Sequence, residues 1–205
     1  MSLEEILEEE NLGIEVLHPG GLEITRELAE LCGINEKSKV LDVACGTGET
    51  ACFLAETFGC EVVGVDASPL MIEKAKNKAK MRGLEGKTTF ILADAHKLPF
   101  PDNTFDVVIS ECTLCLLNKE VIEGWKKLFE QAGLVDVVVI DKSHLIPEWM
   151  KEMRKEVGII GELKIFLKIL RKEGLKGLKN AWESMKIFES PYTGYVIIVG
   201  RKPAR

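Results

Sequence analysis

Several features that would place a protein in a particular class are missing from this sequence. No stretch of its 205 residues approaches the roughly 18 consecutive apolar residues of a membrane-spanning helix, so no membrane span is expected. The first residues are acidic and lack the basic-then-apolar order of a secretory signal, which favours a cytoplasmic protein. Glutamine occurs once, at Gln131, while Glu and Lys are abundant, a bias that leans towards a thermophilic source.

Residues that could together bind a structural metal ion are also few. The chain has three histidines and six cysteines, and without a secretory signal the cysteines are expected to be reduced thiols. Cys112 and Cys115 form a single C-x-x-C pair, whereas a structural zinc site needs four ligands. We therefore predict no metal site and interpret the pair as apolar lining of a substrate pocket. Metal binding, or binding of a soft substrate such as arsenite, stays an alternative for these two thiols.

Charged residues are unevenly distributed along the chain. With 46% apolar and 29% charged residues the composition is that of a globular protein, and we interpret residues 1–205 as a single domain. Residues 142–205 carry fourteen Lys and Arg against seven Asp and Glu, whereas the whole chain has a formal net charge of −6. The acidic remainder argues against nucleic-acid binding, and the basic end suggests a separate surface role.

Residues 39–50, KVLDVACGTGET, combine a short apolar run with a glycine turn. Val40, Leu41 and Val43 are strand formers bounded by turn residues, as in a parallel strand that is buried on both faces. Gly46 and Gly48 allow the backbone to bend sharply and to approach a ligand closely. A helix expected over 50–58 would point its first N–H groups at that ligand. The stretch therefore predicts a nucleotide-type binding corner.

Strands and helices alternate along the rest of the chain. We expect further strands at 61–66, 88–92, 105–110, 135–140 and 195–199, and further helices at 3–10, 22–32, 70–81 and 121–132. The alternation predicts an α/β fold with a doubly wound, mostly parallel, Rossmann-like sheet and helices on both faces. Ligands of such sheets bind beyond the carboxyl ends of the strands, where Asp42, Asp66, Asp94 and Glu111 are expected.

Two cofactors fit the glycine corner. Residues 46–51 match G-x-G-x-x-A, a dinucleotide fingerprint that favours a nicotinamide-dependent oxidoreductase. Residues 94–106 match D-A-x-x-L-P-F-x-D-x-x-F-D, and with the corner and Asp66 this pattern resembles the class I S-adenosylmethionine-dependent methyltransferases. The similarity is to the small-molecule branch that includes quinone and arsenite methyltransferases, strongly over 17–115 and more weakly over 124–138. It implies S-adenosylmethionine as methyl donor and S-adenosylhomocysteine as product.

The resemblance also implies which residues bind the donor. The turn at 42–48 would face the amino-acid end and ribose, Asp66 the two ribose hydroxyls, and Asp94 the adenine amino group. The implied set is Asp42, Ala44, Cys45, Gly46, Thr47, Gly48, Asp66, Ala67, Met71, Asp94, Ala95 and Glu111. The residues alone allow other interpretations, with Asp66 as a helix cap, Asp94 as a turn residue and Cys45 as a small residue in a tight turn.

No catalytic residue stands out in the sequence. Methyl transfer is an in-line displacement from an activated donor, so alignment and water exclusion matter more than proton chemistry. Glu111 and His144 are candidates for a base or for a group that binds the acceptor. We expect a small-molecule acceptor, with an apolar one among the alternatives, and a monomer or homodimer. A non-catalytic S-adenosylmethionine-binding protein stays a third interpretation.

A strand that the resemblance implies is missing from the chain. The family's sheet has a fifth strand after the one at 105–110, whereas here 113–120 leads almost directly into the helix at 121–132. Neighbours of a lost central strand would bury unpaired backbone groups. Either residues are absent near Asn118–Val121, or the strand at 135–140 takes the vacant place.

Residues 146–188 are longer than the link that the resemblance implies between the last two strands. We expect two or three helices here, broken at Gly158, Gly174 and Gly177 and forming a lid over the substrate pocket. Because the helices are basic and amphipathic, peripheral contact with an anionic membrane is a second interpretation.

Overall fold

Two compact units make up the chain, in a computed structural model that describes residues 18–111, 124, 126–127, 129–188 and 195–203. The sheet unit is Gly21–Leu114, and the helical unit combines Met1–Gly20 with Cys115–Arg205.

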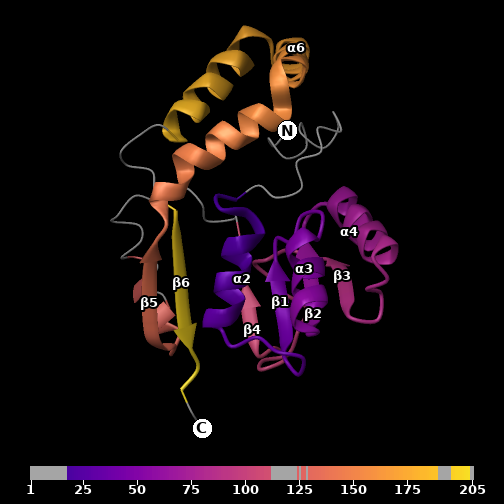
Figure 1. The fold of residues 1–205 in the computed structure, drawn as a ribbon, viewed down its shortest axis with the longest axis vertical. Helices are drawn as coiled ribbons and strands as arrows, with labels where there is room; N and C mark the ends of the chain where they lie inside the picture. The colour runs from indigo at the N-terminus through magenta and orange to yellow at the C-terminus, as the bar shows by residue number, and fades with distance from the viewer. Residues whose placement is uncertain (1–17, 112–123, 125, 128, 189–194, 204–205) are drawn as a thin grey trace. The chain divides into compact units, whose positions relative to one another are not determined.

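The sheet unit is built on four parallel strands (Figure 1). Its elements in chain order are α2 (Gly21–Leu31), β1 (Lys39–Val43), α3 (Glu49–Phe58), β2 (Glu61–Asp66), α4 (Pro69–Met81), β3 (Thr88–Leu92) and β4 (Val107–Ile109). The strand order is β3-β2-β1-β4, which confirms the predicted α/β class. β4 is shorter than the expected strand at 105–110, and just before it the N–H of Lys39 donates to the Asp106 side chain (2.8 Å).

The core of the sheet unit lies between one face of the sheet and the helices. Val40, Val62 and Phe90 project from that face and are buried, together with Leu54 of α3 and Ala75 of α4. Small residues on the helices bring the helix backbones close to the strands and leave few voids. On the opposite face Val108 of β4 is 61% exposed, so the two faces of this four-stranded sheet are unequally covered.

Local signals in the sequence account for the ends of α3 and α4. Gly48 precedes α3 with a φ of 77°, and Gly59 closes it with a φ of 69° while donating its N–H to the carbonyl of Ala55. Ser68 caps α4 by accepting the Met71 N–H, and Pro69 occupies the first turn, where its missing N–H has no intrahelical partner to lose.

The helical unit contains a two-stranded sheet and one long helical segment. β5 (Val135–Asp141) pairs antiparallel with β6 (Val196–Arg201), and between them lie the short 3₁₀ helix η1 (Ser143–Leu145) and α6 (Ile146–Phe188). Two hydrogen bonds tie the start of η1 to Tyr195, the residue before β6. The Lys142 N–H donates to the Tyr195 carbonyl (2.7 Å), and the Tyr195 N–H donates to the side-chain Oγ of Ser143 (3.1 Å).

Glycines divide α6 into three helices. Gly158 and Gly174 have non-helical backbone angles, with φ of 60° and 66°, so both predicted breaks at these positions are confirmed. Gly177, the third expected break, lies within the last helix, and this prediction was wrong. A single glycine weakens a helix without ending it when the flanking residues favour helix. Among the helices of the described residues, none combines the length and apolarity that crossing a membrane requires.

The vacant place beside β4 was one of two explanations offered for the missing strand. Among the described residues β4 pairs with β1 only, and β5 pairs with β6 only, so the strand at 135–141 does not fill that place. The other explanation concerns residues 118–121, which lie outside the described part of the chain, as does the helix expected at 3–10.

Candidate functional site

The predicted donor-binding residues all lie in the sheet unit, at and beyond the carboxyl ends of its strands. Asp42 is level with Gly64 of β2 and Ile109 of β4, and Asp66 ends β2. The glycine turn follows β1 directly. It is anchored by the Cys45 N–H, which donates to the Val65 carbonyl at 3.0 Å. Parallel strands therefore bring residues far apart in the sequence to one edge, as predicted.

Every second residue from Ala44 to Gly48 has a left-handed backbone conformation. Ala44, Gly46 and Gly48 have φ values of 60°, 52° and 77°. The two glycines serve different ends. A Cβ on Gly46 would meet nothing within 4 Å, so this side of the turn is open, whereas a Cβ on Gly48 would lie 2.8 Å from Phe90 Cζ. Gly46 is thus the glycine beside which a ligand has room, and Gly48 is required by packing.

Asp66 orders the turn from the end of β2. Its Oδ2 accepts the Gly46 N–H at 3.0 Å, and its Oδ1 accepts the Ser68 N–H at 2.8 Å. The side-chain cap of α4 comes from Ser68, so the interpretation of Asp66 as the cap of that helix was wrong. Asp66 instead links the glycine turn to the entry of α4. Its carboxylate can accept further donors such as hydroxyls.

Asp94 lies at the surface after β3. Its Oδ1 accepts the backbone N–H of His96 at 2.9 Å and contacts His96 Nδ1 at 2.8 Å. The hydrogen bond from the His96 N–H, followed by the bond from its ring, lowers the pKa of the Asp94 carboxyl. This is the turn geometry that the sequence allowed. The predicted contact with adenine stays a prediction.

Asp42 is a buried carboxylate with two others beside it. Its side chain is 2% exposed, and its buried Oδ2 has no hydrogen-bond partner among the described residues. Burial, with the charges of Glu111 and Asp66 adding to it, raises the pKa of Asp42 to about 8. Leaving a buried acceptor unpaired is costly, so this oxygen marks the place where a donor group of a ligand is expected.

Glu111 is held by two hydroxyls from two different helices. Thr25 Oγ1 of α2 donates to its carboxylate at 3.0 Å, and Thr50 Oγ1 of α3 donates to Oε2 at 2.8 Å. The sequence placed Glu111 at a strand end but gave no sign of these partners. Thr25 and Thr50 are both missing from the predicted site.

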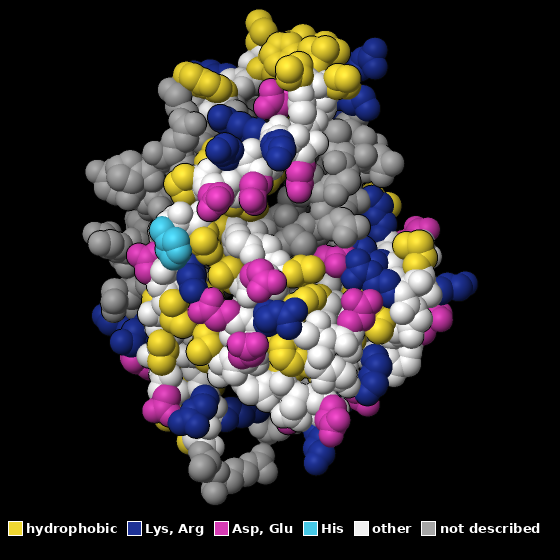
Figure 2. Space-filling view, viewed as in Figure 1, with side chains coloured by type: hydrophobic (Ala, Val, Ile, Leu, Met, Phe, Trp, Pro, Cys, Tyr) yellow, Lys and Arg dark blue, Asp and Glu magenta, His cyan; other side chains and the backbone are white. Residues whose placement is uncertain are grey.

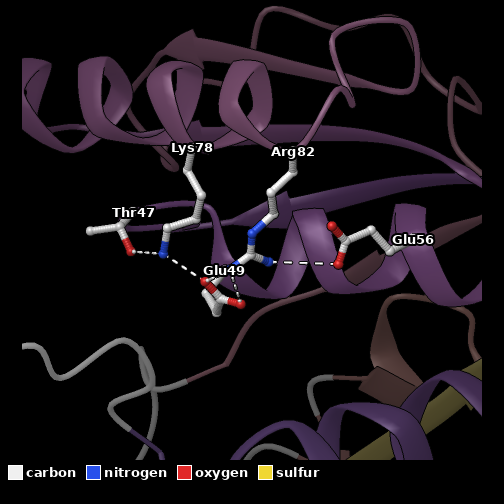
Figure 3. A network of polar contacts seen from close by, with 5 residues as sticks. All are labelled: Thr47, Glu49, Glu56, Lys78 and Arg82. Carbon is white, nitrogen blue, oxygen red and sulfur yellow. Dashed lines mark hydrogen bonds and ion pairs between the residues drawn. The ribbon is translucent and has the colours of Figure 1, made fainter.

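A second polar network beside the turn was also missed (Figure 3). Glu49, the first residue of α3, is buried and accepts from Lys78 Nζ of α4 (2.6 Å) and from Arg82, the residue that follows α4 (2.8 Å). Lys78 Nζ also donates to Thr47 Oγ1 at 3.2 Å. Burial lowers the pKa of Arg82, but the hydrogen bond and charge of Glu49 outweigh it and the net pKa is raised. Two cations four residues apart at the end of one helix, with an acidic residue directly after the glycine turn, could have indicated this network.

The remaining predicted site residues differ in burial and in the unit to which they belong. Cys45 is buried with its Sγ near the Gly46 carbonyl, and burial raises the pKa of its thiol, as suits a small filler rather than a reactive group. Met71 is buried, whereas Ala67 and Ala95 are exposed and available to a ligand.

His144 lies exposed in the helical unit, so its part in the site stays a prediction. Cys112 and Cys115 lie outside the described residues. The described residues bring together no group of three or more His, Cys, Asp or Glu that could hold a metal ion.

Known proteins share both this sequence pattern and this fold. Residues 40–133 match the methyltransferase domain. An uncharacterised protein of Haemophilus influenzae is 34% identical over 174 residues, covering 82% of this chain and 66% of its own length. Methyltransferase GfsG of Streptomyces halstedii is 28% identical over 241 residues, covering 93% and 83%. The chain belongs to the class I S-adenosylmethionine-dependent methyltransferases.

Solved structures of this family have the same fold. Phosphoethanolamine N-methyltransferase 2 of Haemonchus contortus, in complex with S-adenosylmethionine, superposes with a TM-score of 0.72 at 19% identity, over 97% of this chain and 57% of that one. This methyltransferase thus spans less than two thirds of some relatives. The GfsG alignment runs over 241 positions, more than the 205 residues present here, so GfsG has residues without a counterpart in this chain.

Proposed function

We propose that this methyltransferase binds S-adenosylmethionine at the carboxyl edge of its parallel sheet and transfers the methyl group to a small-molecule acceptor. The observation that carries the proposal is the unpartnered Oδ2 of Asp42. Asp42 has the carboxylates of Glu111 and Asp66 near it, and this negative charge suits the donor, whose ammonium and sulfonium are both cationic. A nicotinamide dinucleotide would bring phosphates to the same carboxylates, which disfavours the oxidoreductase alternative.

The residues present fit the parts of the donor. Asp66 accepts the N–H of Gly46, beside which a ligand has room, and offers carboxylate oxygens to two adjacent ribose hydroxyls. Asp42 and Glu111 supply negative charge for the amino-acid end. In the transfer itself the acceptor's lone pair forms a bond to the methyl carbon while the bond between carbon and sulfur breaks, and the sulfur becomes neutral. The protein's part is to align the two reactants and to exclude water.

The surface of α6 bears on the nature of the acceptor. Apolar side chains of α6 are strongly exposed, among them Ile159 (86%), Ile160 (75%) and Leu175 (78%), and Figure 2 shows apolar side chains gathered where α6 lies. Such a surface suits a lid for an apolar acceptor, and the lysines along α6 also suit peripheral contact with an anionic membrane. We therefore propose a small apolar acceptor. We also propose that the enzyme is cytoplasmic and is a monomer or a homodimer.

Calorimetry with S-adenosylmethionine, S-adenosylhomocysteine and NAD tests the donor. Micromolar binding of the first two and none of NAD is expected, and Asp66→Asn should weaken S-adenosylhomocysteine binding at least tenfold, because one of two carboxylate acceptors becomes a donor. Asp102→Asn, a surface carboxylate outside the site, serves as the matched control. Tight NAD binding without S-adenosylhomocysteine binding would contradict the proposal.

A second experiment separates the enzyme from a non-catalytic binding protein. Donor carrying a labelled methyl group is incubated with the protein and with quinone, sterol, phosphorylated amino-alcohol and arsenite acceptors in turn. Transfer of label to one class identifies the acceptor. Donor binding with no transfer to any of them, or to a total small-molecule extract, would favour the non-catalytic interpretation.

A further inference from the structure

Two threonines far from the glycine turn in sequence meet the same carboxylate. Thr25 of α2 is 1% exposed and its Oγ1 lies 3.0 Å and 3.2 Å from the two oxygens of Glu111. Thr50 of α3 donates to Oε2 of Glu111 at 2.8 Å. In these bonds Glu111 is the acceptor, and an ionised carboxylate accepts on both oxygens. The two helices therefore fix Glu111 in place as an anion.

Asp42 has the opposite surroundings. Its Oδ2 is buried and has no partner among the described residues, and no hydrogen-bond donor fixes it as Thr25 and Thr50 fix Glu111. An isolated buried carboxylate next to a fixed anion is expected to bind a proton. The raised pKa of Asp42, near 8 through burial and through the charges of Glu111 and Asp66, agrees with this arrangement.

The groups that face Asp42 come from each neighbouring element. Glu111 comes from the segment after β4, Asp66 from the end of β2 and the Cys45 thiol from the glycine turn, and each of these is acidic or neutral. Thr25 of α2 and Thr50 of α3, which contact Glu111, do not titrate. Lys78 of α4 and Arg82, the residue that follows α4, are paired with Glu49.

We propose that Thr25 and Thr50 are positioning residues that hold Glu111 as a fixed anion beside Asp42, so that the empty site carries one proton on Asp42 and releases it when the cationic donor binds. The inference rests on the proposed function. In the release step the O–H bond of Asp42 breaks, its electron pair stays on the carboxylate and the proton passes to the buffer. The ammonium of the incoming donor then supplies the positive charge that compensates the carboxylate.

Proton release can be counted by calorimetry. S-adenosylhomocysteine, which has the ammonium and does not react, is titrated into the full chain at pH 7 in phosphate, imidazole and Tris, whose ionisation enthalpies differ. The dependence of the observed enthalpy on the buffer gives the number of protons. Close to one released proton is expected for the parent protein, and its affinity should rise up to tenfold per pH unit from pH 6 to 8 and then level off.

Substitutions of the threonines test the positioning role. Thr25→Val keeps the shape and removes the donor, so the empty site holds its proton more tightly; the affinity at pH 7 should drop about tenfold and should level off at a higher pH than in the parent protein. Thr25→Ser restores the hydroxyl and should restore both values. Thr50→Val should act in the same direction, and it carries the test if Thr25→Val does not fold. Thr88→Val is the matched control, because Thr88 is also buried but donates to the Leu84 carbonyl and not to Glu111.

Each outcome bears on one part of the inference. An affinity at pH 7 and a pH of levelling off that are both unchanged in the two valine variants would overturn the positioning role. A parent protein that binds S-adenosylhomocysteine with no proton release would overturn the protonation of Asp42. Failure to bind S-adenosylhomocysteine at any pH, in a folded parent protein, would instead contradict the proposed function.

Discussion

The ring of Phe90 occupies the space that a side chain on Gly48 would need, with its Cζ 2.8 Å from the position of a Cβ there. The same ring lies 2.7 Å from the position of a Cβ on Gly64. Phe90 is buried, so it has little freedom to move away. Two glycines, one in the turn and one in β2, therefore accommodate a single aromatic ring beneath the donor site.

Alanine substitutions at three glycines should separate packing from backbone strain. Gly64→Ala adds only a clash and should lower the free energy of unfolding by about 2 kcal/mol. Gly83→Ala adds only strain, since its φ is 69° and its Cβ position is open, and should cost about 1 kcal/mol. Gly48→Ala combines both, with a cost of about 3 kcal/mol. Urea denaturation measures all three. Equal effects of Gly64→Ala and Gly83→Ala would refute the packing role of Phe90.

Ala44 is the non-glycine residue in the left-handed part of the turn. Its φ is 60° and its side chain is exposed. Replacing it by glycine removes the strain but loosens the unfolded chain, so Ala44→Gly should raise the free energy of unfolding by about 0.5 kcal/mol. Ala67→Gly, at an exposed alanine without a positive φ, should instead lower it by a similar amount. Chemical denaturation of both variants checks the sign, and a loss of stability in Ala44→Gly would contradict the assigned strain.

Glu49 should contribute more to stability than the neighbouring Glu56, although both contact Arg82. Glu49 is buried between Lys78 and Arg82, whereas Glu56 is exposed and 3.7 Å from Arg82. Glu49→Gln leaves two partly buried cations without their anion, and a loss of about 2 kcal/mol is expected after allowing for their partial exposure. Glu56→Gln should change the free energy of unfolding by less than about 0.5 kcal/mol. Thermal unfolding at low and high salt tests the pair, and equal losses would be inconsistent with this account.

The parts of the fold that follow from local chemistry could be predicted from the sequence. The apolar run at Val40–Val43, the two glycines after it and the Ser68-Pro69 start of α4 each act within a few residues, so the pattern of the chain reveals them. The acidic residues at the strand ends were found for the same reason, because a strand end is a local event and the parallel sheet then brings the ends together.

The partners of those acidic residues could not be predicted. Thr25 and Glu111 are 86 positions apart, and Lys78 and Glu49 are 29 apart. Which helix faces which strand end depends on how α2, α3 and α4 pack on the sheet, and no residue pattern within one element contains that information. The protonation of Asp42 could not be predicted for the same reason, since it depends on Glu111 and on burial together.

Asp42 should lower the stability of the empty protein as the pH rises. Its pKa in the folded protein is about 8, above the ordinary value of 3.8, so the folded state binds the proton more tightly than the unfolded state does. Ionising Asp42 costs more free energy in the folded state than in the unfolded state, so stability is lost as the pH rises from about 4 to about 8.

Asp42→Asn removes this pH-dependent loss of stability. The Tm of the variant relative to the parent should therefore increase from pH 5 to pH 8 and stay constant above, as measured by thermal unfolding without donor. Glu111→Gln should flatten the same pH dependence, since it removes one of the two charges acting on Asp42, while Asp102→Asn controls for the loss of a surface carboxylate. A Tm difference between Asp42→Asn and the parent that is the same at pH 5 and pH 8 would show that Asp42 is ionised throughout.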